Sequence, residues 1–378
     1  MTLHRVHGMD RGVVAPDWPP IDDGELSIPL SELGRDARDV EVLWRSPRPM
    51  SAGALVRVGS ETVFVKRHHH RVRSVERLER EHRFAAHLRA HGVETPRALR
   101  GEHSSVAVAG DYRYEAYELA SGHDRYRDVP SWHPYVDGAD ARGAGQMLAR
   151  LHRAAASFDE PADDLSVLMD SSVLIDGRDP VSAIEELLRR RPGLARATAS
   201  YRLVDDVSDV LSGPLAVAHR AARELSRQWT HGDWHPSNLT WAPGSTGRVQ
   251  AVIDLGLANR TFAVHDLATA IERAVIDWLD VARRGAVSAD LGALEALLDG
   301  YAAERPLHRS DLVALAAVLP VVHVEYALSE VEYFGDVVNS PANRDLAYHG
   351  YLLGHARWFT SVAGRALLGA ITRRTVLG

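Results

Sequence analysis

The chain has 378 residues, of which 45% are hydrophobic and 25% are charged, and such a chain can form a globular core that fills about two lobes or domains. A formal net charge of −7 argues against nucleic acid as the main partner. The absence of cysteine excludes a disulfide framework and a thiolate metal site.

The beginning of the chain predicts an arm followed by a small α/β unit. Residues 1–35 are rich in Pro and Asp, and we expect them to pack on or beside this unit. Residues 61–66 alternate as in a strand and end on Lys66. A helix is expected over 74–91, because apolar residues recur there at steps of three and four, and Glu81 borders their stripe. A single Lys on an edge strand is usually solvated, so this pattern alone identifies no site.

The next elements indicate a boundary between two lobes. Residues 112–119 are rich in aromatic and β-prone side chains and predict a strand. Ala-Ser-Gly at 120–122 then interrupts the pattern, which suits a hinge. Residues 143–154 predict a long central helix, with His152 as a core residue at its end. The predicted parts are therefore an arm (1–35), a first lobe (36–119), a hinge (120–122) and a second lobe (123–378).

The second lobe contains a dense group of polar residues. The segment Trp229–Leu239 reads Trp-Thr-His-Gly-Asp-Trp-His-Pro-Ser-Asn-Leu and supplies Asp233 and Asn238. A strand expected over 249–253 leads directly to Asp254. One Asp-Gly or His-Pro pair is usually a surface turn, but the complete set is difficult to obtain by accident.

These three side chains meet the needs of phosphoryl transfer, which depends on alignment and charge neutralisation more than on covalent catalysis. An Asp in a catalytic loop can orient the attacking hydroxyl and take its proton late, and this role is expected of Asp233. Mg²⁺ prefers hard oxygen ligands, so Asn238 and Asp254 are the expected metal ligands.

The sequence His-Gly-Asp-Trp-His-Pro-Ser-Asn at 231–238 resembles the His-Gly-Asp-x-His-x-x-Asn motif of the aminoglycoside phosphotransferase family, relatives of the protein kinases. Ile-Asp-Leu-Gly at 253–256 resembles that family's counterpart of the kinase Asp-Phe-Gly, and His-Asp-Leu-Ala at 265–268 resembles its downstream Asp-Leu-Ala. The resemblance implies a two-lobed, protein-kinase-like α/β (α+β) fold. Its N-lobe would be a small antiparallel sheet with one helix, and its C-lobe would be mostly helical.

The resemblance also implies a nucleotide site between the lobes, for ATP or GTP with Mg²⁺. Lys66 would contact the α- and β-phosphates, and Glu81 would hold Lys66 in place. Glu76 and Glu79 are competing candidates for that partner, since they lie on the same predicted helix.

Three further roles follow from the same resemblance. The backbone from Glu118 to Ala120 would pair with the adenine edge. Within the second lobe, His231 would shape the catalytic loop and Asp266 would brace it.

The first lobe departs from the kinase pattern at one place. A protein-kinase glycine-rich loop has several closely spaced glycines, whereas residues 45–53 contain a single one. Arg45, Arg48 and Ser51 are candidates for covering the phosphates, and a plain surface loop is an equal alternative. The basic stretch 66–73 has the composition of a nucleic-acid patch or a His metal tract, and we favour a turn that carries solvated charge.

Two acidic regions of the second lobe are candidates for an acceptor site: the loop-like segment 159–170 and the late helix 323–335. An acidic wall edged by aromatic rings suits a cationic ligand with hydroxyl groups. A solvated helix face is the alternative. The acidic residues predicted to line the pocket are Glu325, Glu332 and Asp336, and Tyr326 and Tyr333 share an adjacent face.

The interpretation that we favour is a kinase for a polar, cationic antibiotic with a free hydroxyl, hence a resistance or self-protection enzyme. The alternatives are a metabolic kinase for choline, homoserine, methylthioribose or a sugar amine, and a non-catalytic relative that binds a ligand. No apolar run approaches the length of a membrane span and no signal-peptide core is present, so we expect a cytoplasmic protein without a membrane partner. The choice between ATP and GTP, the acceptor and the oligomeric state stay open.

Overall fold

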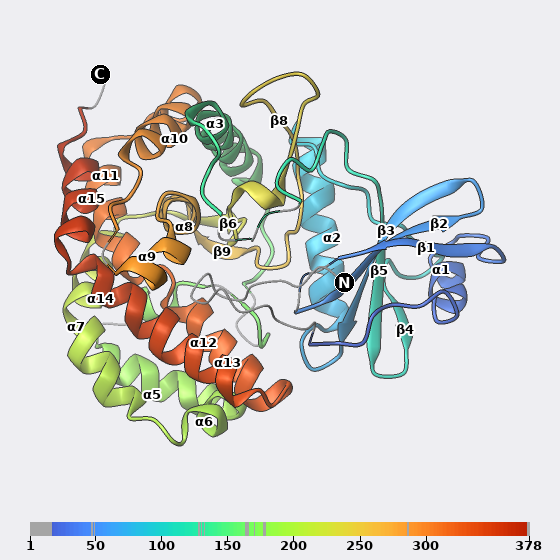
Figure 1. The fold of residues 1–378 in the computed structure, drawn as a ribbon, viewed down its shortest axis with the longest axis horizontal. Helices are drawn as coiled ribbons and strands as arrows, with labels where there is room; N and C mark the ends of the chain where they lie inside the picture. The colour runs from blue at the N-terminus through green and yellow to red at the C-terminus, as the bar shows by residue number, and fades with distance from the viewer. Residues whose placement is uncertain are drawn as a thin grey trace.

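The computed structural model describes residues 17–375 except 47, 49, 128, 130, 132, 163–165, 170, 177–178 and 286. A small lobe with a five-stranded antiparallel sheet is joined to a larger lobe that is mostly helical (Figure 1). This arrangement confirms the predicted two-lobed, protein-kinase-like fold.

The sheet of the small lobe has the strand order β1-β2-β3-β5-β4. Alternate side chains of β3, such as Val63 and Val65, are buried in the core of this lobe, as expected for a strand with one covered face. Lys66 on β3 lies opposite Gly53 of β2 and Glu115 of β5. The strands are β1 (Val40–Arg45), β2 (Ala52–Val58), β3 (Glu61–His69), β4 (Ala107–Ala109) and β5 (Tyr112–Glu118).

Strand β3 is longer than predicted, and the interpretation of residues 66–73 as a solvated turn fits only the exposed residues 70 and 71. Arg67 and His68 are only 3% and 8% exposed. Arg67 donates to the Glu25 carboxylate at 2.6 and 2.7 Å, and His68 Nε2 lies 3.0 Å from Glu115 Oε1. The partners of both residues come from distant parts of the chain, so the local sequence does not reveal them.

Two helices pack on this sheet. Helix α1 (Ser27–Glu32) belongs to the arm, and its Leu30 lies in the same buried cluster as Val63. Helix α2 (Val75–Ala90) lies between the sheet and the large lobe (Figure 1). It begins where predicted, because the Ser74 hydroxyl accepts a hydrogen bond from Arg77 N at 3.2 Å and so caps the helix.

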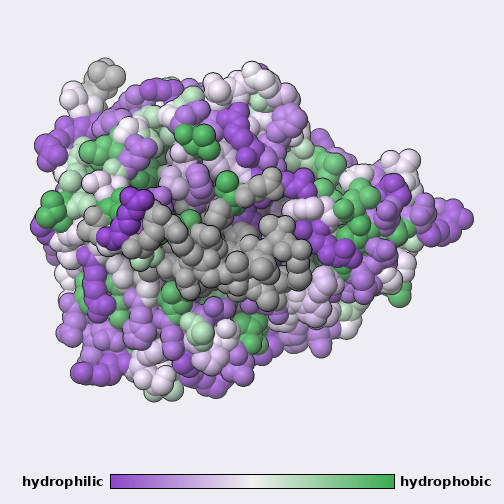
Figure 2. All heavy atoms as spheres, in the orientation of Figure 1, coloured by the Kyte–Doolittle hydropathy of each residue, from purple (hydrophilic) through white to green (hydrophobic). Residues whose placement is uncertain are grey.

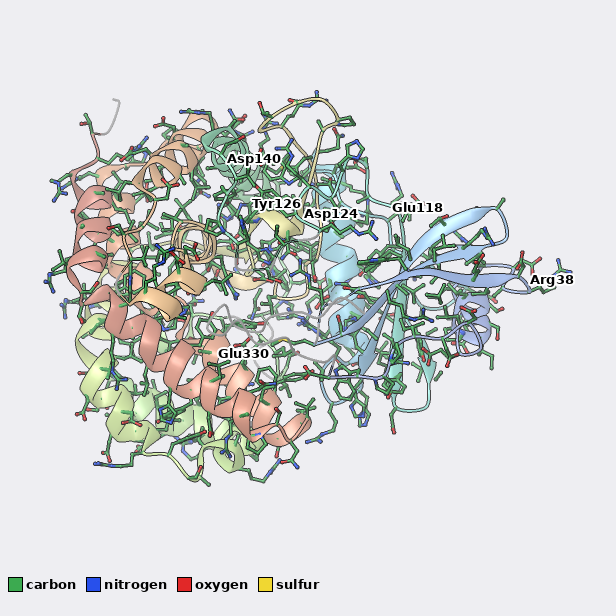
Figure 3. The ribbon with its side chains drawn as sticks, viewed as in Figure 1. Arg38, Glu118, Asp124, Tyr126, Asp140 and Glu330 are labelled. Atoms are coloured by element: carbon green, nitrogen blue, oxygen red, sulfur yellow. The ribbon has the colours of Figure 1, made fainter. Side chains whose placement is uncertain are left out.

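The chain leaves the small lobe after β5 and is fastened to the large lobe soon afterwards. Thr240 Oγ1 donates to Ser121 O at 2.6 Å. Tyr126 OH donates to Asp140 Oδ2 at 2.7 Å, and Arg125 forms an ion pair with the same carboxylate. Figure 3 shows Tyr126 and Asp140 on the large-lobe side of the crossing and Glu118 on the small-lobe side. These bonds tie the connecting segment to the first turn of the central helix.

The large lobe is built around α3 (Gly138–Ala155), which begins five residues before the predicted helix start at 143. Two short antiparallel pairs, β6 with β9 and β7 with β8, support the loops that face the small lobe. These strands are β6 (Arg227–Thr230), β7 (Leu239–Trp241), β8 (Val249–Val252) and β9 (Asn259–Phe262).

Helices form the rest of this lobe in the part of the chain that the structure describes. Their buried side chains make one large core that includes Trp229, Trp234 and Trp278. The helices that follow α3 are α4 (Val173–Asp176), α5 (Pro180–Arg190), α6 (Pro192–Thr198), α7 (Leu203–Ala222), η1 (Pro236–Asn238), α8 (Ala263–Ala274), α9 (Trp278–Arg284), α10 (Leu291–Glu304), α11 (Arg309–Val318), η2 (Leu319–Val321), α12 (Val324–Glu332), η3 (Tyr333–Val337), α13 (Pro341–Asp345), η4 (Leu346–His355), α14 (Ala356–Phe359) and α15 (Val362–Arg373).

One helical run is longer and more apolar than expected. Arg309–Val337, 29 residues from α11 to η3, has the length and composition of a membrane span, so the expectation that no run would approach one is wrong. Of its most apolar window, 83% is buried inside the protein, as in the core helix of a globular lobe. On the face shown in Figure 2, polar side chains cover most of the coloured surface, and hydrophobic ones form small separate patches.

Candidate active site

The segment that carries the polar motif is a tight loop between β6 and η1. Gly232 has φ +78°, and a Cβ atom there would lie 2.2 Å from Leu257 O, so only glycine fits. The buried Asp266 carboxylate accepts hydrogen bonds from His231 N at 2.8 Å and from Gly232 N at 2.9 Å. His152 Nε2 lies 3.0 Å from Asp266 Oδ2 and holds it from the other side. Helix α8 therefore fixes the backbone of this loop through Asp266.

His231 is bonded at both ring nitrogens. Its Nδ1 accepts a hydrogen bond from Asp233 N at 3.2 Å, and its Nε2 lies 3.2 Å from Ile253 O, to which it donates. The ring thus joins the loop to the end of β8. This geometry agrees with the loop-shaping role predicted for His231.

The side chain of Asp233 is held from three directions. Asn238 Nδ2 donates to Asp233 Oδ2 at 3.2 Å, and His235 Nε2 lies 3.5 Å from the same oxygen. The other oxygen, Oδ1, faces Arg273 Nη2 at 3.4 Å and has no hydrogen-bond partner within the described chain. Burial acts to raise the pKa of Asp233, but the charge of Arg273 and the hydrogen bond of His235 hold that pKa well below its ordinary value.

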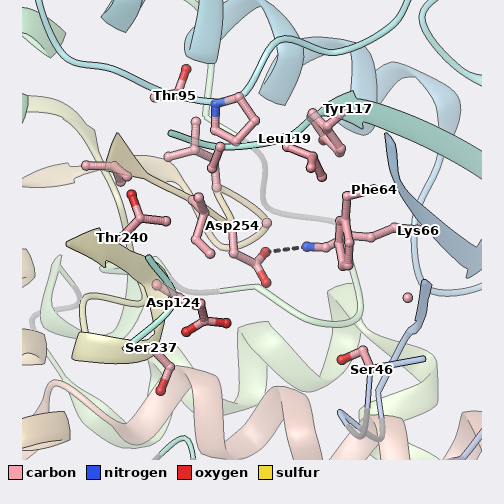
Figure 4. Close-up of a pocket in the computed structure, with 18 of the residues that line it drawn as sticks. Ser46, Phe64, Lys66, Thr95, Tyr117, Leu119, Asp124, Ser237, Thr240 and Asp254 are labelled. Carbon is pink, nitrogen blue, oxygen red and sulfur yellow. Dashed lines mark ion pairs between the residues drawn. The ribbon is translucent and has the colours of Figure 1, made fainter. Parts of the chain in front are cut away.

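The two predicted metal ligands are brought together by backbone pairing. Ile253 N donates to Asn238 O at 2.9 Å, which places Asp254 beside the motif. Asp254 has φ +58°, a left-handed conformation that is uncommon outside glycine and that clusters at functional sites. Its Oδ1 lies 2.9 Å from Lys66 Nζ across the cleft (Figure 4). The ammonium group outweighs the effect of burial and lowers the pKa of Asp254.

The structure does not join Lys66 to Glu81, the partner predicted for it. Glu81 Oε1 instead accepts from Arg77 Nε at 2.8 Å and from Arg73 Nη1 at 3.1 Å. Arg77 Nη2 continues to Ala258 O at 2.6 Å, so α2 is linked to the loop that follows Asp254. Of the competing candidates, Glu79 accepts from Ser104 Oγ at 2.7 Å. The Glu81 carboxylate is therefore bonded to two arginines, and Lys66 pairs with Asp254 instead.

A cavity of about 360 Å³ lies between the lobes next to the connecting segment. Glu118 and Ala120, the predicted base-binding positions, line it, and Glu118 N already donates to Arg97 O at 2.9 Å. Figure 4 shows Tyr117, Leu119 and Phe64 around the space opposite Thr240 and Ser237. The apolar residues of the lining include Leu55, Phe64, Ala85, Leu119, Val252 and Ile253. A cavity with apolar side chains around it and backbone groups at one edge suits a nucleobase.

The glycine-poor loop between β1 and β2 reaches this cavity. Ser46, Arg48, Ser51 and Gly53 line it, whereas Arg45 turns away and donates from Nε to Ile21 O at 2.7 Å. Burial lowers the pKa of Arg48, and the carboxylates of Asp124, Asp254 and Asp233 oppose that shift. Arg48 therefore lies among the acidic groups of the cleft, so the alternative of a plain surface loop is wrong for this residue.

A second cavity, of about 180 Å³, adjoins the first on the side of Asp233. Arg273, Tyr326 and Glu330 line it, and the Arg273 guanidinium lies 4.8 Å from the centre of the Tyr326 ring. In Figure 3, Glu330 lies beside α12 on the side that faces the small lobe. This cavity therefore offers a buried carboxylate and a phenol opposite Asp233.

The three acidic residues predicted to line the acceptor pocket do not line either cavity. Glu332 Oε2 lies 2.6 Å from Arg191 Nη2, and Asp336 pairs with Arg196 at 2.7 Å and Arg71 at 2.9 Å. Their shared helix face packs against other parts of the protein, so the prediction chose the wrong face of α12.

Glu325 is part of the same correction. Its Oε1 accepts from Leu174 N at 2.6 Å, and its other oxygen accepts from the Ser171 hydroxyl. Burial raises its pKa to about 7. The other predicted acidic region is also paired where it is described: Glu160 binds Arg83 at 2.6 Å, while Asp163, Asp164 and Asp170 lie outside the described residues.

The Glu332→Gln variant tests this correction. We expect the Michaelis constant for a cationic acceptor to stay unchanged, because Glu332 lies outside the cleft, and the free energy of unfolding to fall by about 3 kcal/mol, because Arg191 loses its buried partner. Steady-state kinetics and chemical denaturation measure the two effects. A Michaelis constant raised tenfold with unchanged stability would restore the original prediction.

Arg273 and Glu330 were not predicted as site residues, although the helical spacing of each gives a weak signal. Arg273 follows Asp266 by seven residues, which is two helical turns on the same face of α8. Glu330 follows Tyr326 by four residues on α12, so its carboxylate shares a face with that ring. Neither spacing reveals that the faces meet at Asp233.

The fold and the site together define a kinase-like phosphotransferase. The chain belongs to the phosphotransferase enzyme family, whose family model matches residues 52–307. This membership confirms the resemblance inferred from the motifs. No curated protein sequence matches the chain.

Solved structures with the same fold have low sequence identity to this chain. A microcompartment-associated aminopropanol kinase has TM-score 0.56 and 17% identity, with 94% of this chain and 100% of that chain covered. An amicoumacin kinase in complex with AMP-PNP and Ca²⁺ has TM-score 0.53 and 13% identity over 87% and 92%. An aminoglycoside phosphotransferase from Alicyclobacillus acidocaldarius has TM-score 0.51 and 18% identity over 94% and 96%.

Proposed function

We propose that the protein is an ATP- or GTP-dependent kinase that requires Mg²⁺ and transfers the γ-phosphate to a hydroxyl group of a small polar acceptor. One observation carries the proposal. Lys66, Asn238 and Asp254 line both cavities, whereas Asp233 lines only the second. A nucleotide in the first cavity would thus present its phosphates where the cavities meet, and an acceptor in the second would lie next to Asp233.

In the proposed reaction, Asp233 orients the acceptor hydroxyl and accepts its proton late in the transfer. The hydroxyl oxygen forms a bond to the γ-phosphorus, and the bond from that phosphorus to the β–γ bridging oxygen breaks. The bridging oxygen leaves with the electron pair, and the products are the phosphorylated acceptor and a nucleoside diphosphate. Lys66 neutralises phosphate charge, with Arg48 as a second cation on the loop above it.

The residues at the junction fit a magnesium ion. Asn238 Nδ2 is engaged by Asp233, so its amide oxygen is the group that remains for a cation. Asp254 adds a carboxylate that is partly exposed in the cleft. When bound there, Mg²⁺ would neutralise charge on the phosphate oxygens. Lys66, which pairs with Asp254 in this structure, would then be available to the phosphates.

For the acceptor, we keep the cationic class and revise the residues that would bind it. Glu330 and Tyr326 replace the predicted acidic wall, since they line the second cavity. A compact amino alcohol or similar metabolite is one candidate acceptor for this cavity. An antibiotic remains the alternative, because the similar structures include kinases with both kinds of name. Retention of Asp233, Asn238 and Asp254 argues against a non-catalytic relative.

The test is to detect phosphorylated product by mass spectrometry after incubating the protein with Mg-ATP or Mg-GTP. The acceptor panel should contain compact amino alcohols, hydroxy amino acids, sugar amines and aminoglycosides, with Asp233→Asn as the inactive control. Product that only the wild type makes would support the proposal and identify the acceptor class. Nucleotide binding without any product across the panel would instead favour a binding protein.

The Glu330→Gln variant tests the revised acceptor site. We expect the Michaelis constant for a cationic acceptor to rise about tenfold or more, because a charged hydrogen bond contributes roughly 1.5–3 kcal/mol. The turnover number should change little. Comparing the acceptor with an analogue that lacks the amine supplies the control, since the variant should not weaken that analogue. An equal rise of the Michaelis constant for both compounds would show that Glu330 does not bind the amine.

A further inference from the structure

We propose that Arg273 is the positioning residue for Asp233, so that one helix, α8, sets both the backbone and the side chain of the catalytic loop. This inference rests on the proposed kinase function. It assigns a role to a residue outside the three motifs of the sequence.

The N-terminal end of α8 holds the loop backbone. Asp266 lies in the first turn and accepts hydrogen bonds from His231 N and Gly232 N, the two residues directly before Asp233. Two turns later, Arg273 Nη2 reaches Asp233 Oδ1 at 3.4 Å. Because an α-helix is stiff over two turns, the distance between these two attachment points is fixed by the helix itself.

Arg273 is in turn held by buried neighbours. Its Nε lies 3.7 Å from Glu272 Oε2, and its guanidinium stacks over the Tyr326 ring at 4.8 Å. Glu272 Oε1 is bonded to His355 Nδ1 at 2.7 Å, and the His355 ring is stacked on Trp278 with 3.4 Å between the ring centres. The side chain of Arg273 is only 7% exposed. The guanidinium thus occupies one defined place beside the second cavity.

The two oxygens of Asp233 consequently face different partners. Oδ2 is directed toward Asn238 and His235, and Oδ1 is directed toward Arg273. Oδ1 makes no hydrogen bond inside the described chain, so it keeps its capacity to accept one from the acceptor hydroxyl. Arg273 holds this oxygen on the acceptor side by charge attraction and exchanges no proton itself. Without Arg273, Asn238 and His235 still hold the carboxylate through Oδ2, but the direction of Oδ1 is no longer fixed.

The experiment compares Arg273→Ala, Arg273→Lys and wild type in steady-state transfer to an acceptor that the wild type phosphorylates. We expect Arg273→Ala to lower the turnover number about a hundredfold, because loss of alignment near the reacting group has this magnitude. The dissociation constant for Mg-nucleotide, measured by calorimetry, should stay within about threefold of wild type, since Arg273 lines only the second cavity. Arg273→Lys should keep part of the turnover.

A matched control separates positioning from folding. Arg191 is also a buried arginine of the large lobe, 4% exposed and paired with Glu332, but it lies outside both cavities. Arg191→Ala should lower the melting temperature to a similar extent and leave the turnover number of the folded protein unchanged. Added methylguanidinium should raise the turnover of Arg273→Ala at least tenfold and should not affect Arg191→Ala.

The possible outcomes are distinct. A turnover number for folded Arg273→Ala within threefold of wild type would overturn the inference. A large loss with no methylguanidinium rescue and no retention in Arg273→Lys would also overturn it, because the defect would then be structural. A wild type that phosphorylates nothing would instead refute the proposed function itself.

Discussion

Replacing Asp233 with Asn is expected to lower turnover by about a thousandfold or more, because the variant loses both the proton acceptor and the charge that orients the hydroxyl. The substitution keeps the shape of the side chain, so the bond from Asn238 to the backbone carbonyl of residue 233 should persist. Binding of Mg-nucleotide should therefore remain close to wild type, since Asp233 does not line the first cavity. Single-turnover kinetics and calorimetry measure the two quantities.

A loss of turnover without a loss of nucleotide binding would identify Asp233 as the base. Loss of a purely structural carboxylate would lower the melting temperature and leave the turnover number of the folded protein unchanged. Glu332→Gln supplies that comparison, because it alters a buried carboxylate outside the cleft. Turnover of Asp233→Asn within tenfold of wild type would refute the assignment of Asp233 as the base.

Replacing Asp254 with Ala should act on nucleotide binding itself. The variant removes a predicted metal ligand that is also the ion-pair partner of Lys66 at the junction of the two cavities. We expect the affinity for Mg-nucleotide to fall on the order of a hundredfold or more, since even outer-shell changes at metal sites cost 10- to 100-fold. Calorimetric titration with a non-hydrolysable nucleotide, with and without Mg²⁺, measures the effect.

Comparing nucleotide affinity with and without Mg²⁺ shows whether Asp254 acts as a metal ligand. In the wild type, Mg²⁺ should strengthen nucleotide binding, and in Asp254→Ala this gain should largely disappear. Asp36→Ala is the control, because Asp36 is an exposed carboxylate paired with Arg38 at the far tip of the small lobe (Figure 3). A full Mg²⁺ response in Asp254→Ala would exclude Asp254 as a metal ligand.

The sequence by itself was sufficient to predict the fold, because strands and helices follow short-range patterns. The roles predicted for Asp233, Asn238 and Asp254 stay predictions, although the three residues lie together at one cavity. Asp233 and Asn238 lie five residues apart in one tight loop, and Asp254 follows a strand whose backbone pairs with that loop. Such spacing determines the relative positions of the side chains almost independently of the rest of the chain. Strand alternation and helical periodicity likewise identified β3, α2 and β5.

The partners of charged side chains were decided only by the tertiary structure. Glu81 was predicted to hold Lys66, but Arg73 and Arg77 lie nearer and take its carboxylate. A helical stripe gives the face on which a residue lies and not what packs against that face. The choice among several cations within reach depends on distances of a few ångströms between separate elements.

The acceptor site was predicted on the wrong helix face for the same reason, because a helical stripe does not show what packs against it. Periodicity on α12 identified two adjacent faces, one with Glu332 and one with Tyr326, and the acidic face was predicted to line the pocket. In the folded protein Glu332 meets Arg191, while Tyr326 and Glu330 face the cavity beside Asp233. Which face of a helix meets a cleft and which meets a neighbouring helix is set by packing between segments that are far apart in the chain, and no local pattern encodes it.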